Sequence, residues 1–172
     1  YVIVDNCSSD GTGDIVQKHA AEDGRIRVVR PPEHLSMIQN HNFALRQMSS
    51  ESRYCKIVHA DDKLLPACLE LMVAVGEQHP SASIVGSYSL RNAKVVSDGI
   101  PLDTSLVPGK ELSRQTLLRQ LYCFWSPSGL LLRSASVRER GNFYNGDHLH
   151  ADVEACYELL QTSDFAFVHQ VL

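Results

Sequence analysis

The sequence predicts an α/β fold, a Rossmann-like sandwich with a mainly parallel central sheet and helices on both faces. The first observation is that predicted strands and helices alternate through the first half of the chain, in the order β-loop-α-β-α-β-α-β. The second is the strand at residues 1–4, a continuous apolar run typical of a parallel sheet that is covered on both faces. The 172 residues, 44% of them hydrophobic, suit a single domain with its own core.

The elements of the first half are predicted from the spacing of apolar residues. Apolar residues three and four apart indicate helices, and short apolar runs between turn residues indicate strands. The segment 37–48 shows the helical spacing, with His41, Ala44, Leu45 and Met48 on one face. In chain order we expect a strand at 1–4, a polar loop at 5–13, a helix at 14–21 capped by Asp10 or Thr12, a strand at 26–29 stopped by Pro31 and Pro32, a helix at 37–48, a strand at 54–62, a helix with Pro66 in its first turn, and a strand at 82–88.

The second half is less regular. Between residues 90 and 108, glycines and prolines indicate loops or short hairpin strands. The remaining expected elements are a helix at 111–121, an aromatic, turn-forming segment at 122–128, a strand at 129–133, a polar loop at 143–150, a helix with Asp152 at its start, and a strand at 165–172.

Composition excludes several classes of function. The net charge of -4 and the lack of a basic patch argue against nucleic acid as a partner. No apolar run reaches the ~18 residues of a membrane-spanning helix. The five cysteines are scattered without a paired spacing, which favours a reducing, cytoplasmic compartment. Both chain ends fall inside apolar runs, so we expect a fragment of a longer protein, cut at both ends.

Two adjacent carboxylates, Asp61 and Asp62, end the predicted strand at 54–62. The carboxyl ends of strands in an α/β sheet form the edge at which ligands bind. Adjacent carboxylates repel each other unless a cation lies between them, and a divalent cation that carries phosphate oxygens would satisfy both. The alternative is that the two residues only cap the next helix.

Asp5 ends the first strand in the same way, so it should lie along the same sheet edge. Its carboxylate could accept hydrogen bonds from a base or a ribose, or it could simply start the loop as an Asx-turn residue. A dinucleotide fingerprint is excluded because Val16 stands where its third glycine should be. A phosphatase loop is excluded because Ser8 occupies the position of the carboxylate nucleophile.

The string His148-x-His150-x-Asp152 has two interpretations. Histidine and aspartate at this spacing occur in zinc hydrolases, although Val153 stands where such enzymes have a further histidine. Alternatively, Asp152 opens a helix, whose dipole favours the ionised carboxylate that a general base requires. A plain N-cap role for Asp152 is compatible with the second interpretation.

Several segments, taken in order, resemble the family 2 glycosyltransferases with the GT-A fold. The matching residues are Val4-Asp5-Asn6-Cys7-Ser8-Ser9-Asp10-Gly11-Thr12 for V-D-x-x-S-x-D-G-T, Gln39-Asn40-His41-Asn42 for R-N-x-g, His59-Ala60-Asp61-Asp62 for D-x-D-D, Ser126 to Arg133 for the strand before the acceptor region, and His150-Ala151-Asp152-Val153-Glu154 for the E-D motif. The sequence departs from the family pattern at His59 and Ala151, each of which replaces an acid, and it lacks the family's first strand–helix unit.

The resemblance implies an inverting glycosyltransferase that moves a sugar from a nucleotide-diphosphate sugar to a hydroxyl of a glycan or lipid-linked acceptor. Asp5, Ser8, Asp10 and Asp61 would bind the nucleotide sugar, Asp61 and Asp62 would hold Mg²⁺ or Mn²⁺, and Asp152 would be the catalytic base. Residues 1–89 would form the nucleotide-binding part and 90–172 the acceptor-side part. The protein would be cytoplasmic, either free or peripheral to a membrane.

The sequence leaves two other functions open. A non-catalytic nucleotide-binding module derived from a transferase would explain His59 and the absent first unit. A metallohydrolase would use His148, His150 and Asp152 as zinc ligands.

Overall fold

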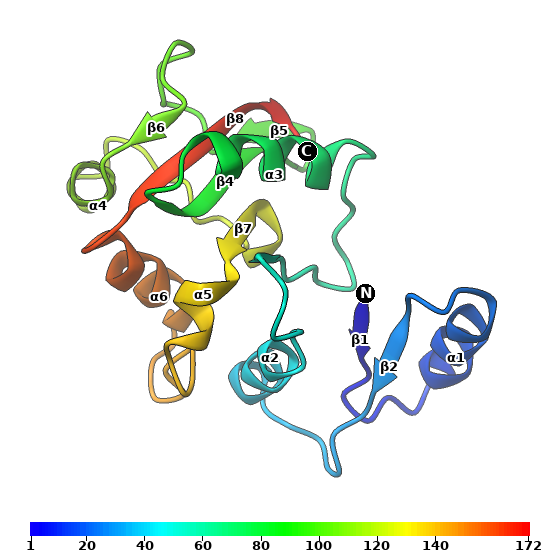
Figure 1. Ribbon diagram of the computed structural model, residues 1–172. Helices are drawn as coiled ribbons and strands as arrows, with labels where there is room; N and C mark the ends of the chain where they lie inside the picture. Colours follow the sequence, from blue (N-terminus) through cyan, green and yellow to red (C-terminus); the bar gives the residue numbers. More distant parts are fainter. The chain divides into compact units, whose positions relative to one another are not determined.

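The computed structural model describes residues 1–172 and confirms the α/β class (Figure 1). The chain forms two compact units. Unit 1 comprises residues 1–51 and 142–151, and unit 2 comprises residues 52–141 and 152–172. The expected division between residues 89 and 90 cuts through a strand, β4 (Ala82–Arg91), so the two parts predicted from the sequence are not the compact units of the structure.

Unit 1 is built on a short β-α-β arrangement. Strand β1 (Val2–Val4) pairs in parallel with β2 (Arg27–Val29), and α1 (Thr12–Glu22) connects them. Helix α2 (Met37–Arg46) begins at a complete capping box, in which Ser36 accepts from the amide of Gln39 and the Gln39 side chain accepts from the amide of Ser36. Each of these elements begins and ends within two residues of its predicted position.

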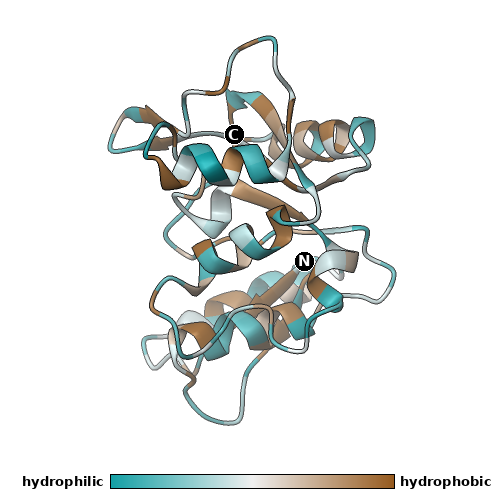
Figure 2. Cartoon of the chain, turned by 90° about the vertical axis from the view of Figure 1, so that its left-hand side faces the viewer, coloured by the Kyte–Doolittle hydropathy of each residue, from teal (hydrophilic) through white to brown (hydrophobic).

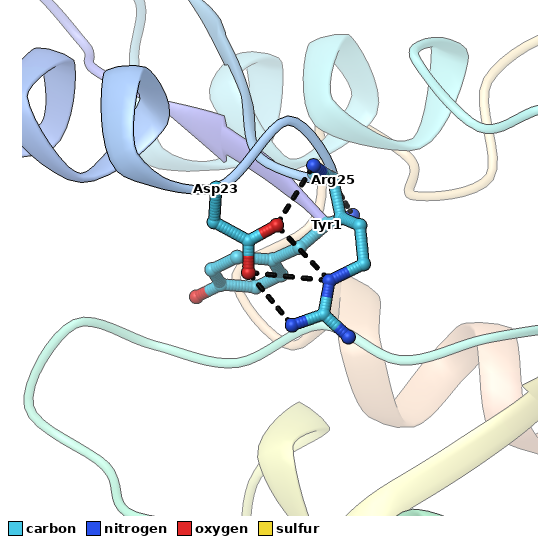
Figure 3. A network of polar contacts seen from close by, with 3 residues as sticks. All are labelled: Tyr1, Asp23 and Arg25. Atoms are coloured by element: carbon cyan, nitrogen blue, oxygen red, sulfur yellow. Dashed lines mark hydrogen bonds and ion pairs between the residues drawn. The ribbon is translucent and has the colours of Figure 1, made fainter.

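The turn from α1 into β2 is held by a local ion pair (Figure 3). The Arg25 guanidinium donates to Asp23 through Nε at 3.0 Å and Nη2 at 2.7 Å, and the Arg25 amide donates to Asp23 Oδ1 at 2.9 Å. The backbone nitrogen of Tyr1 donates to the carbonyl oxygen of Arg25 at 2.8 Å. Hydrogen bonds from Arg25 lower the pKa of Asp23 to about 2, so this carboxylate remains ionised at neutral pH.

A buried asparagine joins α2 to the later segment of unit 1. The Asn42 side chain donates to the Tyr144 carbonyl oxygen at 2.7 Å and accepts from the Tyr144 amide at 2.9 Å. These two residues are 102 positions apart in the chain. Because the amide satisfies both backbone groups of one residue, it fixes where residues 142–151 rejoin unit 1.

Unit 2 contains a six-stranded sheet. Its strands follow the order β3-β7-β4-β8-β6, with β5 paired to β4 outside this path. The strands are β3 (Tyr54–Cys55), β4 (Ala82–Arg91), β5 (Lys94–Val96), β6 (Leu106–Val107), β7 (Leu130–Arg133) and β8 (Asp164–Val171). The predicted hairpin between 90 and 108 is present as the β4–β5 pair, which turns at Asn92 and Ala93, both with positive φ.

The prediction of a mainly parallel sheet was wrong for unit 2. Only β4 and β8 pair in parallel there, and all other pairs are antiparallel. A continuous apolar run shows that both faces of a strand are covered, but it carries no information on strand direction. Strand β4 enters a hairpin directly instead of a helical crossover, so its next partner returns in the opposite direction.

The core of unit 2 lies between α3 (Cys68–Gln78) and the central strands β4 and β8. Met72 is fully buried against this sheet, beside Val85 and Ala166. Figure 2 shows apolar colour along the strands and mixed colour on the helices, as expected for helices with one buried face.

The remaining helices are α4 (Gly109–Leu117), the 3₁₀ turn η1 (Pro127–Gly129), α5 (Ser134–Arg138) and α6 (Ala151–Leu160). None of the helices is long and apolar enough to cross a bilayer.

Gly109 should be essential for stability, because α4 begins where the chain has no room for a side chain. A Cβ atom at this position would lie 2.5 Å from the Leu160 carbonyl oxygen and would also overlap the carbonyl oxygen of Ser163. We expect Gly109→Ala to lower the free energy of unfolding by roughly 3 kcal/mol, although alanine favours helices. Urea unfolding measures the loss. Gly141→Ala is the control, because a Cβ there meets nothing within 4 Å. Equal stability of the two variants would contradict the packing.

Candidate functional site

In unit 1, the loop after β1 is organised by Asp5. This carboxylate is buried, and its Oδ1 accepts a hydrogen bond from the Ser8 amide at 2.9 Å. Its Oδ2 lies 3.6 Å from Nη1 of Arg30, and the same guanidinium donates to the Ser8 carbonyl oxygen at 3.2 Å. The loop-forming role proposed as the alternative for Asp5 is therefore present in the structure, and Arg30 adds a cation that the sequence did not single out.

The electrostatics keep Asp5 ionised. Hydrogen bonds from Ser8 lower its pKa below the ordinary value of 3.8, and Arg30 lowers it further, while burial acts in the opposite direction. Asp10, by contrast, is exposed, and its carboxylate accepts from Oγ1 of Thr12 at 2.7 Å and from the Thr12 amide at 3.2 Å. These bonds lower the pKa of Asp10 as well. The loop thus presents two anionic carboxylates at neutral pH.

The predicted cap of α1 was wrong. The N-cap position is Gly11, with φ of 84°, and neither Asp10 nor Thr12 occupies it. Asp10, the residue before the N-cap, still accepts a hydrogen bond from the amide of Thr12, the first residue of the helix. Glycine is favoured here because this left-handed conformation is costly for other residues.

The Asp5 network predicts a pH-dependent loss of stability. Because the folded pKa of Asp5 is depressed, its ionised form contributes stability above pH 3.8, and this contribution disappears as the pH falls through the lower folded value. Asp5→Asn should lower the free energy of unfolding by about 1 kcal/mol at pH 7 and by much less once the wild-type residue is protonated. Urea unfolding across this pH range tests it, with the exposed Asp14→Asn as the control. A pH-independent difference would contradict this account.

In unit 2, the candidate acids lie on a loop and not at the end of a strand. The predicted strand at 54–62 was too long, because the ladder stops at Cys55, after two residues paired with β7. Beyond this point side chains replace the ladder hydrogen bonds. Lys56 Nζ donates to the Leu130 carbonyl oxygen at 3.3 Å, and the His59 amide donates to Ser128 Oγ at 3.0 Å. Neither Asp61 nor Asp62 caps α3, whose N-cap is Ala67.

The structure brings His59, Asp61 and Asp62 together. The nitrogen or oxygen atoms that each could offer to a metal lie within 4.8 Å of one another. A backbone hydrogen bond of 3.1 Å from the Asp62 amide to the His59 carbonyl oxygen closes the turn that groups them. Both aspartates are exposed, and the His59 side chain is 32% exposed. We refer to these three residues as the His–Asp–Asp cluster.

Two serines at the start of η1 support the cluster. Ser126 Oγ donates to Asp62 Oδ2 at 3.3 Å and accepts from the Ser128 amide at 3.2 Å. Ser128 Oγ in turn accepts the His59 amide hydrogen at 3.0 Å. In the sequence these serines appear only as part of a strand motif, because nothing there indicates that a segment more than 60 residues away reaches the cluster.

The donor set of the His–Asp–Asp cluster fits a divalent cation. Carboxylate oxygens suit Mg²⁺ and Mn²⁺, and an imidazole nitrogen is a common ligand of transition metals. Two atoms that bind one ion at about 2.1 Å are at most about 4.2 Å apart. The candidate ligand atoms of the cluster lie within 4.8 Å of one another, so only a small side-chain rotation is needed for them to reach one ion. The exposed carboxylates can make this rotation.

Asp152 lies in the first turn of α6 as its second residue, so it is not the N-cap that the sequence suggested. Its charge acts on Tyr122 and Cys156. Burial raises the pKa of Tyr122, and the negative charge of Asp152 raises it further. Burial likewise raises the pKa of Cys156 to about 12, with a smaller contribution from Asp152.

The zinc-hydrolase interpretation receives no support from the contacts of His148. Its Nδ1 lies 3.3 Å from the Asn145 side-chain nitrogen, within the loop that precedes α6. The group of metal-ligand types that the structure brings together is the His–Asp–Asp cluster, in a different part of the chain.

Comparisons with known proteins cover nearly the whole chain. The family model described as Glycosyl transferase family 2 matches residues 1–139, a range that includes Asp5 and the His–Asp–Asp cluster but not Asp152. The chain is 32% identical over 118 residues to the putative teichuronic acid biosynthesis glycosyltransferase TuaG of Bacillus subtilis (strain 168), which covers 69% of this chain and 44% of that protein. It is 30% identical over 174 residues to the uncharacterized protein y4gI of Sinorhizobium fredii (strain NBRC 101917 / NGR234), covering 99% of this chain and 18% of that protein. The chain therefore spans less than half the length of either relative.

The fold resembles that of S. aureus TarS. A crystal structure of TarS 1-349 superimposes with a TM-score of 0.77 at 19% identity, covering 98% of this chain and 48% of that one. Structures of the same TarS segment in complex with UDP and with UDP-GlcNAc each superimpose with a TM-score of 0.68 at 18% identity, covering 97% and 99% of this chain and 50% of that one. At these identities the similarity shows a common fold.

Proposed function

Because this chain belongs to glycosyl transferase family 2, we propose that the protein transfers a sugar from a nucleotide-diphosphate sugar to an acceptor hydroxyl, with inversion at the anomeric carbon. The observation that carries the proposal is the His–Asp–Asp cluster, which lies inside the segment that matches the family. Two carboxylates and an imidazole, grouped on a solvent-exposed loop, form a site suited to the metal that a diphosphate leaving group requires.

Asp61 and Asp62 would hold Mg²⁺ or Mn²⁺. When bound, the metal neutralises the charge that develops on the diphosphate as the sugar leaves. The protein's part is to hold the two carboxylates ready, which it does through the turn at His59 and the bond from Ser126 to Asp62. Carboxylates that are already held in position lose less conformational freedom when a metal binds. The metal, and with it the diphosphate, would therefore bind more tightly.

Asp5, Ser8 and Asp10 would bind the nucleoside end of the donor. Asp5 is already ionised and fixed by Ser8 and Arg30, so its remaining acceptor positions are rigid. A rigid carboxylate is suited to hydroxyl or N–H donors of a base or ribose, as in other nucleotide-binding α/β folds. Asp10 is exposed and anionic, and it would accept a further hydrogen bond.

Asp152 would act as the general base. An in-line displacement needs a group that removes the proton of the acceptor hydroxyl as the new bond forms. Asp152 lies in the first turn of α6, and its carboxylate oxygens can accept that proton. Inversion follows if the acceptor attacks the face opposite the leaving diphosphate.

The relatives suggest which donor and which class of acceptor the protein uses. TarS has been crystallised with UDP and with UDP-GlcNAc, and TuaG is named for teichuronic acid biosynthesis, so we propose a UDP-sugar donor and a glycan or lipid-linked acceptor. Five free cysteines support a reducing, cytoplasmic compartment.

The test is turnover by the full-length protein. Purified protein is incubated with a panel of UDP-sugars and Mn²⁺, and the release of UDP is measured with and without glycan acceptors. We expect acceptor-stimulated release that stops when the metal is chelated. Tight binding of UDP without any turnover across donors and acceptors would overturn the catalytic proposal and favour a nucleotide-binding module instead.

A further inference from the structure

We propose that His59 is itself a metal ligand and that its imidazole makes the His–Asp–Asp cluster select Mn²⁺ over Mg²⁺. This inference deepens the proposed function and rests on it for the presence of a metal. It assigns a role to the residue at which the sequence departs from the all-carboxylate pattern of the family it resembles.

The imidazole is placed to share an ion with the carboxylates. Nδ1 of His59 lies 3.8 Å from Oδ2 of Asp62, and the side chains of His59 and Asp62 are 32% and 41% exposed. Atoms that bind the same ion at about 2.1 Å are between about 3 and 4.2 Å apart, so this pair already has a suitable separation. As an ion pair alone, a contact of this length and exposure would contribute little to stability.

Residues 126–128 hold both ligands in place. Ser128 fixes the backbone of His59 through a 3.0 Å hydrogen bond, and Ser126 fixes the Asp62 carboxylate through a 3.3 Å hydrogen bond. The two serines are tied to each other by the bond from the Ser128 amide to Ser126 Oγ. Outer hydrogen bonds that orient ligands in this way are a regular feature of metal sites in proteins.

The chemistry of the ligand determines which metal is favoured. Mg²⁺ is bound through oxygen and gives up its water reluctantly, so an imidazole adds little to its affinity. Divalent transition metals accept imidazole nitrogen readily, with affinities that rise from Mn²⁺ towards Cu²⁺. A histidine in a set with two carboxylates should therefore raise affinity for Mn²⁺ and Co²⁺ relative to Mg²⁺.

The test measures metal binding directly, with no dependence on catalysis. The full-length protein is titrated with Mn²⁺ and, separately, with Mg²⁺ in the presence of UDP, and nitrogen coupling to bound Mn²⁺ is recorded by electron spin-echo spectroscopy. The variants are His59→Asp, which replaces the nitrogen ligand with oxygen, and His34→Asp, which removes an exposed histidine from the other compact unit. Asp61→Asn serves to identify the site that binds the metal.

We expect wild-type protein and His34→Asp to show nitrogen coupling, and His59→Asp to lose it. The preference for Mn²⁺ over Mg²⁺ should fall roughly tenfold in His59→Asp. Bound Mn²⁺ without nitrogen coupling, or an unchanged preference in His59→Asp, would overturn the inference and leave the proposed transferase activity intact. Absence of Mn²⁺ binding would also overturn it, and UDP release from UDP-sugars would then decide separately whether the protein is a transferase.

Discussion

Asp152→Asn is expected to lower sugar transfer by ~10²–10⁴-fold, the usual cost of removing a general base. Asparagine has almost the same shape as aspartate but cannot accept the proton of the acceptor hydroxyl. The donor affinity should change by no more than a few-fold, because the proposed contacts to the donor are made by other residues. The melting temperature should change little, since Asp152 is not the N-cap of α6 and loses only a favourable interaction with the helix dipole.

The matched control is Asp147→Asn, which removes an exposed carboxylate from the loop that precedes α6. It should transfer sugar at the wild-type rate. Initial rates at saturating donor, together with UDP affinity and melting curves, separate a catalytic loss from a folding defect. Near-normal turnover by Asp152→Asn would remove Asp152 from the mechanism and make Glu154, two residues later, the next residue to test.

Asp61→Asn and Asp62→Asn should each lower kcat/KM by at least about 100-fold. Loss of hydrogen-bond partners around metal ligands already costs 10–100-fold in affinity or activity, and loss of a ligand should cost as much or more. An amide is a weaker and uncharged ligand, so excess Mn²⁺ should recover part of the activity. The rates are measured over a range of Mn²⁺ concentrations.

Asp103→Asn provides the comparison, because it removes an exposed carboxylate from the same compact unit without touching the cluster. Its rate should match the wild type at every Mn²⁺ concentration. If Asp61→Asn and Asp62→Asn behaved like Asp103→Asn, the cluster would have no part in donor binding.

Much of the fold could be predicted from the sequence, because local patterns determined it. The spacing of apolar residues and the turn residues between apolar runs placed most elements to within two residues. The predicted family was confirmed over residues 1–139. The five-residue helix α5 was missed, because it is too short to show a helical period.

What could not be predicted depends on contacts between distant residues. Apolar runs show burial but not strand direction, so the antiparallel pairing of β7 with β4 was not foreseen. The run from Tyr54 to Val58 looks like one strand, yet the ladder ends at Cys55 because Lys56 and His59 bond to residues near 128–130 through side chains. Arg30 beside Asp5 was missed for the same reason, since nothing near it in sequence marks it.

The most direct measurement of the central claim is the affinity of the full-length protein for UDP with and without Mn²⁺, determined by titration calorimetry. If the chain binds the diphosphate of a nucleotide sugar through a metal at Asp61 and Asp62, UDP should bind far more tightly when Mn²⁺ is present, and the difference should disappear in Asp61→Asn. Equal affinity for UDP in the presence and absence of metal, or no binding in either case, would contradict the account.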